Sequence, residues 1–263
     1  MKCIDIIEEI KSWAKREIDP ERTCDTVKCG DANRKVSRVA ITMFATPDVV
    51  RQALDWGAQL LIVHEPTFYD HMDKSIDTFI AEEKKKFVEQ SGIVIFRFHD
   101  YAHAMNPDLI YEGEIKALGL EGKCVSVTEH EKFGINNYLL DSEMTAKELA
   151  KTIEKNLGLK HVRIAGNPDA KGRKISCSFG TPGHLEAELA ENDFLLTGEI
   201  CEWRVGEMAR DYAQLGYNKA VIVMSHEGSE RAGMMLLEEK LKEKYSDIEF
   251  KYFECGEVYS YTD

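Results

Sequence analysis

The stretch Leu60-Leu61-Ile62-Val63-His64-Glu65-Pro66 decides the fold, because an apolar run passes directly into a histidine, a carboxylate and a proline. Short runs of apolar and β-branched residues are typical of a buried strand, so we expect a strand over 60–63. In open α/β sheets, ligands bind at the carboxyl ends of the strands, which is where His64 and Glu65 fall. Two adjacent side chains that can bind a metal indicate a site whose other ligands lie elsewhere in the chain.

The composition is that of an ordinary globular protein. The 263 residues allow one large domain or two ordinary ones. A hydrophobic fraction of 43% and a charged fraction of 31% leave enough apolar residues for a sizeable core. The formal net charge of −13 argues against nucleic acid as a partner, because affinity for phosphates depends on clustered Lys and Arg.

The cysteines indicate a reducing compartment. The chain has 7 of them, scattered from Cys3 to Cys255 with no C-x-x-C pair, and the spacing of Cys24 and Cys29 matches no strong zinc pattern. We therefore expect reduced cysteines in a cytoplasmic protein. Acidic residues interrupt the apolar N-terminal segment, so we expect no signal peptide. No apolar run reaches the roughly 18–20 residues that a membrane-spanning helix needs.

Strands and helices alternate in the first half of the chain. We expect helices over 3–17, 47–57, 75–90 and 108–118, strands over 39–44, 60–63, 93–98 and 123–128, and an extended loop over 18–35. Such alternation is typical of a largely parallel sheet with helices packed on it. We assign residues 1–125 to an N-terminal α/β lobe that carries the first metal ligands.

A second α/β lobe, residues 126–263, is expected to carry the remaining ligands. A capping box at Thr145-Ala146-Lys147-Glu148 opens a helix that runs to about residue 156. Further helices are expected over 202–214 and 229–243, and strands over 138–140, 161–164, 175–179, 194–199, 220–224 and 248–253. No low-complexity linker marks the boundary, and the last strand is a candidate to return to the first lobe.

Two further strand ends carry histidines with acidic neighbours. His99-Asp100-Tyr101-Ala102-His103 follows one strand, and Ser225-His226-Glu227-Gly228-Ser229-Glu230 follows another. The i, i+4 spacing of His226 and Glu230 aims both side chains at one point if the turn is helical. The alternative is that His226 packs on a turn and Glu230 is only a charge at the start of a helix.

Imidazole and carboxylate ligands without a nearby thiolate suit zinc, iron or manganese, and more than four of them indicate two ions rather than one. Glu199, at another strand end, is a candidate general base or a carboxylate that orients a ligand imidazole. It is equally well explained as a neighbour of a helix N-cap. The other histidines have no supporting cluster and are expected on the surface or in loops: His71, His130, His161 and His184.

The order of these motifs resembles the NIF-three-like family of dinuclear-metal proteins, which are catalogued as homologues of a type-two GTP cyclohydrolase I. The matching stretches are Ala45-Thr46, Val63-His64-Glu65-Pro66, His99 to His103, Thr197-Gly198-Glu199 and Ser225 to Glu230. The resemblance implies an α/β, NIF-three-like fold of two lobes with the metal site between them. It also implies a homo-oligomer, in this family a ring-shaped hexamer.

The resemblance further implies five metal ligands: His64, Glu65, His103, His226 and Glu230. Glu65 stands where the family has histidine, and His103 stands where it has aspartate. The set still contains three histidines and two carboxylates, so we interpret the departures as an exchange between the two positions. Asp100 is a backup ligand, and His99 is expected to orient the loop. A degenerate site without metal is the alternative that these departures raise.

Two divalent ions of zinc, iron or manganese that share a water lower its pKa and stabilise both oxygens of a displacement. The resemblance therefore implies a metal-dependent hydrolase acting on a small molecule, with a nucleotide or phosphate type indicated by the family's catalogued name. A metal-binding or metal-handling scaffold or regulatory protein without turnover is the alternative. Neither a Gly-x-Gly-x-x-Gly nor a Walker phosphate loop is present in the sequence.

Overall fold

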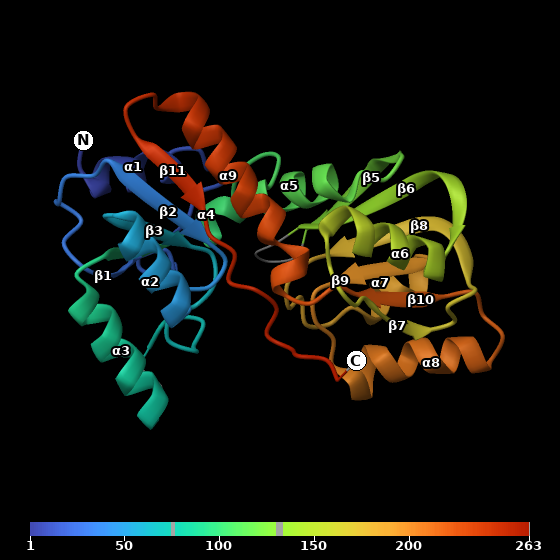
Figure 1. Cartoon of the computed structure of the whole chain (residues 1–263). Coiled ribbons are helices and arrows are strands. Elements are labelled where there is room, and N and C mark those ends of the chain that lie inside the picture. The colour runs from blue at the N-terminus through green and yellow to red at the C-terminus, as the bar shows by residue number, and fades with distance from the viewer. Residues whose placement is uncertain (75–76, 130–133, 263) are drawn as a thin grey trace. The chain divides into compact units, whose positions relative to one another are not determined.

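The computed structural model describes residues 1–74, 77–129 and 134–262, and it divides the chain into two compact units. Unit 1 comprises Met1–Gly113 and Arg231–Gly256, and unit 2 comprises Glu114–Glu230 and the residues from Glu257 onward. Both units are therefore discontinuous in sequence, and the last strand, which was a candidate to return to the first lobe, lies in unit 1. Each unit is built around its own sheet (Figure 1).

The sheet of unit 1 has the strand order β1-β4-β3-β2-β11. Its strands are β1 (Val27–Cys29), β2 (Arg38–Thr42), β3 (Leu60–Val63), β4 (Val94–Arg97) and β11 (Glu249–Tyr252). The four strands from β4 to β11 are parallel, and β1 joins the edge of β4 in the antiparallel direction. The α/β class and the parallel sheet expected from the first half of the chain are thus confirmed.

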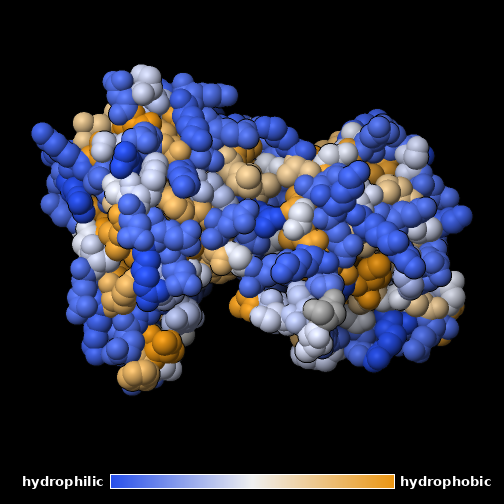
Figure 2. Space-filling model, viewed as in Figure 1, coloured by the Kyte–Doolittle hydropathy of each residue, from blue (hydrophilic) through white to orange (hydrophobic). Residues whose placement is uncertain are grey.

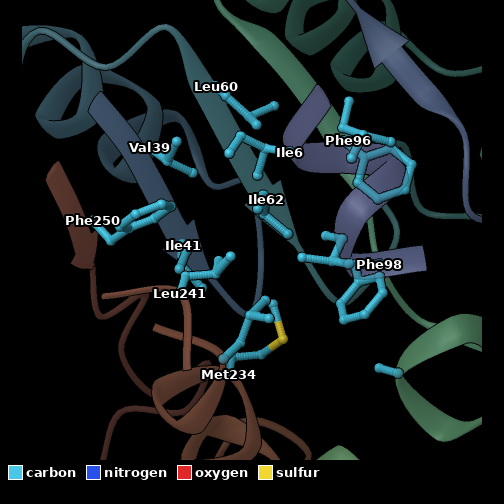
Figure 3. Packing of buried hydrophobic residues seen from close by; sticks show 14 of the residues in the cluster. Ile6, Val39, Ile41, Leu60, Ile62, Phe96, Phe98, Met234, Leu241 and Phe250 are labelled. Atoms are coloured by element: carbon cyan, nitrogen blue, oxygen red, sulfur yellow. The ribbon is translucent and has the colours of Figure 1, made fainter. Parts of the chain in front are cut away.

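Helices cover both faces of this sheet, because successive residues of each buried strand point to opposite faces. Leu60 and Ile62 of β3 pack in one apolar core with residues of α1 (Cys3–Lys11), α5 (Leu109–Leu118) and α9 (Arg231–Lys244). Figure 3 shows Ile62 of this core beside Ile6, Met234 and Leu241. The alternate residues, Leu61 and Val63, pack with α2 (Pro47–Trp56) and α3 (Phe79–Ser91).

Helix α1 is shorter than the predicted helix over 3–17, because polar contacts close it after Lys11. The Ser12 hydroxyl donates to the carbonyl of Glu9 at 2.6 Å, and the Trp13 indole N–H donates to the Glu9 carboxylate at 2.7 Å. Trp13 therefore continues the apolar spacing of the helix but packs against the core from the turn that follows.

The sheet of unit 2 has the order β5-β6-β8-β9-β10-β7 and is mixed, with only β8, β9 and β10 parallel. Its strands are β5 (Gly122–Glu129), β6 (Gly134–Thr145), β7 (Arg163–Gly166), β8 (Lys171–Ser178), β9 (Phe194–Thr197) and β10 (Ala220–Val223). The predicted strand over 138–140 is the middle of β6. The sequence showed only this part because polar residues flank it.

Helices also pack on the sheet of unit 2. They are α6 (Ala146–Leu157), α7 (Glu186–Glu191) and α8 (Glu207–Gln214), with a π-helical segment, η1 (Glu202–Gly206), before α8. The predicted capping box of α6 is present, since Thr145 and Glu148 bond to each other's backbone N–H groups. The predicted helix over 202–214 therefore begins as a π-helical turn, a feature that occurs often near functional sites.

The face drawn in Figure 2 is largely hydrophilic, with hydrophobic residues scattered over it. The most exposed large apolar side chains in the described ranges include Phe79, which is 80% exposed, and Trp203, which is 76% exposed. Within the part of the chain that the structure describes, no helix combines the length and the apolar character needed to cross a bilayer.

Lys84 of α3 gives a prediction on pH, because burial lowers the pKa of its ammonium from 10.5 to about 8. Its Nζ lies 4.8 Å from the ring centroid of Tyr69. Between pH 8 and 10.5 the unfolded chain holds a proton that the folded chain has lost, so stability rises with pH across this window. Lys84→Met is expected to raise the free energy of unfolding by about 1–3 kcal/mol at pH 7 and progressively less toward pH 10.5.

Urea denaturation at both pH values measures this difference, and Lys85→Met on the exposed face of α3 is the matched control. An equal gain at pH 7 and at pH 10.5 would contradict the assignment of the penalty to the buried charge.

Candidate metal centre

Two neighbouring parallel strands of unit 1 end at one edge of the sheet, with Val63 of β3 opposite Arg97 of β4. The polar residues that follow are therefore delivered to the same place: His64 and Glu65 after β3, and His99 after β4. A single helical turn, α4 (Asp100–His103), then returns His103 to this edge. The strand-end arrangement expected from the sequence is thus present within unit 1.

The imidazole of His64 is fully buried and has a fixed orientation. Its Nδ1 lies 3.0 Å from the carbonyl oxygen of Phe98. Because a carbonyl oxygen only accepts, Nδ1 carries the proton and Nε2 presents its lone pair. Burial, and then the neighbouring His99, hold the pKa of His64 well below its ordinary value, so the ring is neutral. A neutral imidazole with one anchored nitrogen is the form that binds a metal.

Carboxylates orient the other two imidazoles in the same way. Nδ1 of His99 lies 2.9 Å from Asp100, and Nδ1 of His103 lies 2.7 Å from Asp108. Burial alone would raise the pKa of both carboxyl groups, but their histidine partners and other hydrogen bonds hold each pKa below its ordinary value. Ionised Asp100 and Asp108 therefore accept from Nδ1–H, which leaves Nε2 of each histidine as the metal-binding nitrogen.

The three imidazoles form a histidine cluster, defined by His64, His99 and His103. One nitrogen from each ring lies within 4.8 Å of the others, and the ring centroids are 4.7, 5.0 and 5.2 Å apart. Nitrogen ligands of a tetrahedral zinc ion, with bonds of about 2.0–2.1 Å, lie about 3.4 Å from one another. A small closure of the side chains therefore reaches that spacing, and the residues fit a divalent ion.

Glu65 lies beside the histidine cluster and supplies a carboxylate. Its Oε1 is 3.9 Å from Nε2 of His64 and 3.8 Å from Nε2 of His99. The backbone N–H groups of His64 and Glu65 both donate to the carbonyl of Met43, which fixes the turn after β3. The carboxylate thus lies within 4 Å of the Nε2 atoms of His64 and His99, where it could act as a fourth ligand.

The buried carboxylate of Asp25, in the segment predicted as a loop, holds α4 in place. It accepts the backbone N–H groups of His99, Asp100 and Tyr101 at 2.9, 3.0 and 2.9 Å. Cys24, Asp25, His99 and Asp100 also form a group that could hold a metal by spacing alone. Burial raises the pKa of the Cys24 thiol, and the carboxylates are engaged with N–H donors, so we interpret this group as a structural cap.

Three further residues lie near the cluster or its support. His99, expected to orient the loop, contributes a ring to the cluster, and Asp100, the backup ligand, accepts from His99 and from the Thr23 hydroxyl. His71, expected to lack a supporting cluster, has its ring centroid 5.5 Å from that of His99. The aromatic and charged residues around His71 gave no periodic signal, so the sequence could not place it.

The predicted residues of unit 2 also gather. Nδ1 of His226 lies 2.7 Å from Oε1 of Glu199 and 3.0 Å from the Thr181 hydroxyl, and Nε2 lies 3.2 Å from Oε2 of Glu230. Since Nδ1–H donates to Glu199, the lone pair of Nε2 faces a carboxylate oxygen. Two acceptors at this distance repel each other unless a cation binds to both His226 and Glu230 or the imidazole carries a second proton.

Tight packing fixes the geometry around His226 and Glu230. Gly180 has φ +67°, and a Cβ there would overlap the carboxylate of Glu230. The Ser229 hydroxyl donates to the carbonyl of His226 and accepts the N–H of Gly180. Glu230 directly precedes α9 instead of lying in its first turn, yet its carboxylate meets His226 as the i, i+4 spacing predicted.

Unit 1 thus brings together five predicted residues, namely His64, Glu65, His99, Asp100 and His103. Unit 2 brings together three, namely Glu199, His226 and Glu230. Their service as ligands stays a prediction. Elsewhere in unit 2, the ring centroid of His161 lies 4.0 Å from that of Tyr261 at an interplanar angle of 55°, and His184 accepts a hydrogen bond from Arg204. His130 lies outside the described residues.

Asp108→Asn is expected to weaken metal binding by the cluster about 10–100-fold with little change in stability. The amide oxygen can still accept the N–H groups of Ile110 and Tyr111, as Oδ1 of Asp108 does. The amide NH₂ cannot accept the proton of His103 Nδ1, so the other tautomer is favoured. Calorimetric titration of the apoprotein with zinc measures the affinity. Asp31→Asn, in a surface turn, is the control, and an unchanged affinity would contradict the role of Asp108.

Comparison with known proteins identifies the family. A model of the Duf34/NIF3 (NGG1p interacting factor 3) family matches residues 1–256. The chain belongs to this family. The GTP cyclohydrolase 1 type 2 homolog of Clostridium perfringens (strain 13 / Type A) is 24% identical over 258 residues, which cover 95% of this chain and 95% of that protein. The resemblance inferred from the motifs is therefore confirmed.

Solved structures share the NIF3 fold. The protein ybgI, described as of unknown function, has a TM-score of 0.74 and 20% identity, and the match covers 98% of this chain and 99% of that one. A Bacillus cereus protein related to NIF3 has a TM-score of 0.73 and 15% identity over 96% of each chain. At these identities the likeness shows the fold alone.

Proposed function

We propose that this NIF3-family protein is a metal-dependent hydrolase that uses two divalent ions of zinc, iron or manganese. The observation that supports this most is the anchoring of the histidine cluster. All three Nδ1 atoms lie within hydrogen-bond distance of a carbonyl or carboxylate oxygen, which leaves the Nε2 atoms for a metal. Holding imidazoles in one tautomer by such hydrogen bonds raises their basicity as ligands.

When bound, divalent ions would supply Lewis-acid polarisation of a substrate oxygen and would acidify a water molecule. In unit 1 the histidine cluster and Glu65 would hold an ion. The resemblance adds His226 and Glu230 as ligands, which stays a prediction. Glu199 is bonded to His226 Nδ1, so we assign it the role of orienting that imidazole and not that of a general base.

The proposed substrate is a small nucleotide or another phosphate-type molecule. Support for a nucleotide comes from the relative in Clostridium perfringens, whose name is GTP cyclohydrolase 1 type 2 homolog. Because the chain carries a formal net charge of −13, attraction of such an anion depends on the bound ions and on local cations.

The test has two stages. The protein is purified without chelator and its metal content is measured by mass spectrometry. The apoprotein is then reloaded with Zn²⁺, Fe²⁺ or Mn²⁺ and screened against GTP, other nucleotides, phosphomonoesters and phosphodiesters. We expect turnover by the reloaded protein and none by Glu230→Gln that has retained metal. Bound metal without turnover on any of these substrates would contradict the hydrolase and favour the metal-handling alternative.

A further inference from the structure

Arg97, the last residue of β4, is a fully buried cation directly behind the histidine cluster. Its Nε donates to the carbonyl of His64 at 2.9 Å, and its Nη1 donates to the carbonyl of His71. Its Nη2 lies 3.6 Å from Oε2 of Glu65. One planar group thus contacts both sides of the turn that carries His64 and Glu65, and also the loop that carries His71.

The charges around Arg97 divide into two pairs. Asp73, whose Oδ2 is 3.9 Å from Nη1 of Arg97, has a second and closer cation in Lys28 at 3.0 Å. Arg97 contacts Glu65 as a permanent cation, whereas the imidazoles of His64 and His99, which lie within 4 Å of the same carboxylate, are charged only when protonated. Arg97 therefore serves Glu65, and Lys28 serves Asp73.

The same geometry separates the two oxygens of Glu65. Oε2 faces the guanidinium, whereas Oε1 faces the Nε2 atoms of His64 and His99 at 3.9 and 3.8 Å. The guanidinium thus lies on the side of Oε2 and leaves Oε1 directed at the histidine cluster. A lysine ammonium cannot reproduce this arrangement, because it lacks the planar fork that reaches two carbonyls and a carboxylate together.

We propose that Arg97 is a positioning residue that fixes Glu65 as a one-oxygen ligand of the ion held by the histidine cluster. This inference rests on the metal-binding part of the proposed function and not on hydrolysis. It assigns to Arg97 an effect on the metal that a purely structural role, tying the two loops together, would not have.

Cobalt binding tests the proposal, because the absorption spectrum of Co²⁺ reports its ligands without any turnover. Apoprotein is titrated with CoCl₂ for the wild type, Arg97→Met, Arg97→Lys, Glu65→Gln and the double variant Arg97→Met/Glu65→Gln. We expect the dissociation constant to rise about 10–100-fold in Arg97→Met with an altered spectrum, and to recover in part in Arg97→Lys. We expect the double variant to bind cobalt as tightly as the single variant with the higher dissociation constant, because both changes remove the same ligand.

Lys28→Met is the matched control, since it removes another cation with a buried side chain, one that contacts Asp73 and the Cys24 carbonyl and not Glu65. It is expected to retain the wild-type cobalt affinity and spectrum even where it lowers thermal stability. If Arg97→Met does not fold, the comparison of Arg97→Lys with Glu65→Gln decides, because Arg97→Lys is expected to change the spectrum in the same direction as Glu65→Gln but by a smaller amount. Additive losses in the double variant, or a wild-type spectrum in a folded Arg97 variant, would overturn the proposal. Cobalt binding without hydrolysis would refute only the hydrolase, and a wild type that binds no cobalt would refute the metal site and this role of Arg97 together.

Discussion

His64→Ala is expected to remove one ion per chain and to weaken metal binding in unit 1 by about 100-fold or more. This loss of affinity is larger than the one expected when a residue that only orients a ligand, such as Asp108, is changed. His64 is the most buried ring of the histidine cluster, and its Nδ1 donates to the backbone carbonyl oxygen of Phe98. Alanine supplies neither this hydrogen bond nor a ring nitrogen for the ion. Metal analysis of the purified protein, followed by zinc titration of the apoprotein, measures both effects.

His184→Ala provides the control for His64→Ala, because it removes a histidine whose side chain is 74% exposed and that lies in unit 2. A folded His64→Ala protein with the wild-type metal content would show that the histidine cluster is not the metal site.

Asp25→Ala is expected to lower the free energy of unfolding by about 3–5 kcal/mol, because it leaves three backbone N–H groups near α4 without their acceptor. The same change is expected to weaken metal binding. Helix α4 carries His103, and the N–H groups at the start of α4 that Asp25 accepts also fix the position of His99. Urea denaturation of the apoprotein gives the stability, and zinc titration gives the affinity.

Asp25→Asn separates the contributions of the two carboxylate oxygens of Asp25 to stability. Its amide oxygen can still accept from His99 and Asp100, which share Oδ1, whereas the N–H of Tyr101 loses Oδ2. We expect a loss of about 1–2 kcal/mol for this variant. Equal stability of Asp25→Ala and the wild type would show that the cap is dispensable.

The parts of the fold that the sequence predicted are those with a strong local signal. The apolar runs that end at Val63 and at residue 223 formed buried parallel strands, and the capping box at Thr145 opens a helix. Strand β1 was not predicted, because three partly exposed residues beside Gly30 and Asn33 have the composition of a loop. Its formation depends on pairing with β4, a partner distant in the chain.

The candidate site shows the same limit. The sequence identified His64, Glu65 and His103 because each follows a strand with metal-binding neighbours. It did not identify Asp25, whose hydrogen bonds reach residues more than 70 positions away and leave no local pattern. Nor could it distinguish His99 as a cluster member from His99 as a loop residue, because that depends on which nitrogen Asp100 engages.

The place of β11 has a consequence for the order in which the chain can fold during synthesis. Strand β2 is an interior strand only because β11, near the C-terminus, pairs with its edge, and α9 supplies part of the core on one face. A ribosome completes all the strands of unit 2 before it has made either element. Unit 1, although it begins first, must therefore wait with an unpaired and apolar β2 edge, which is the condition under which nascent chains recruit chaperones or aggregate.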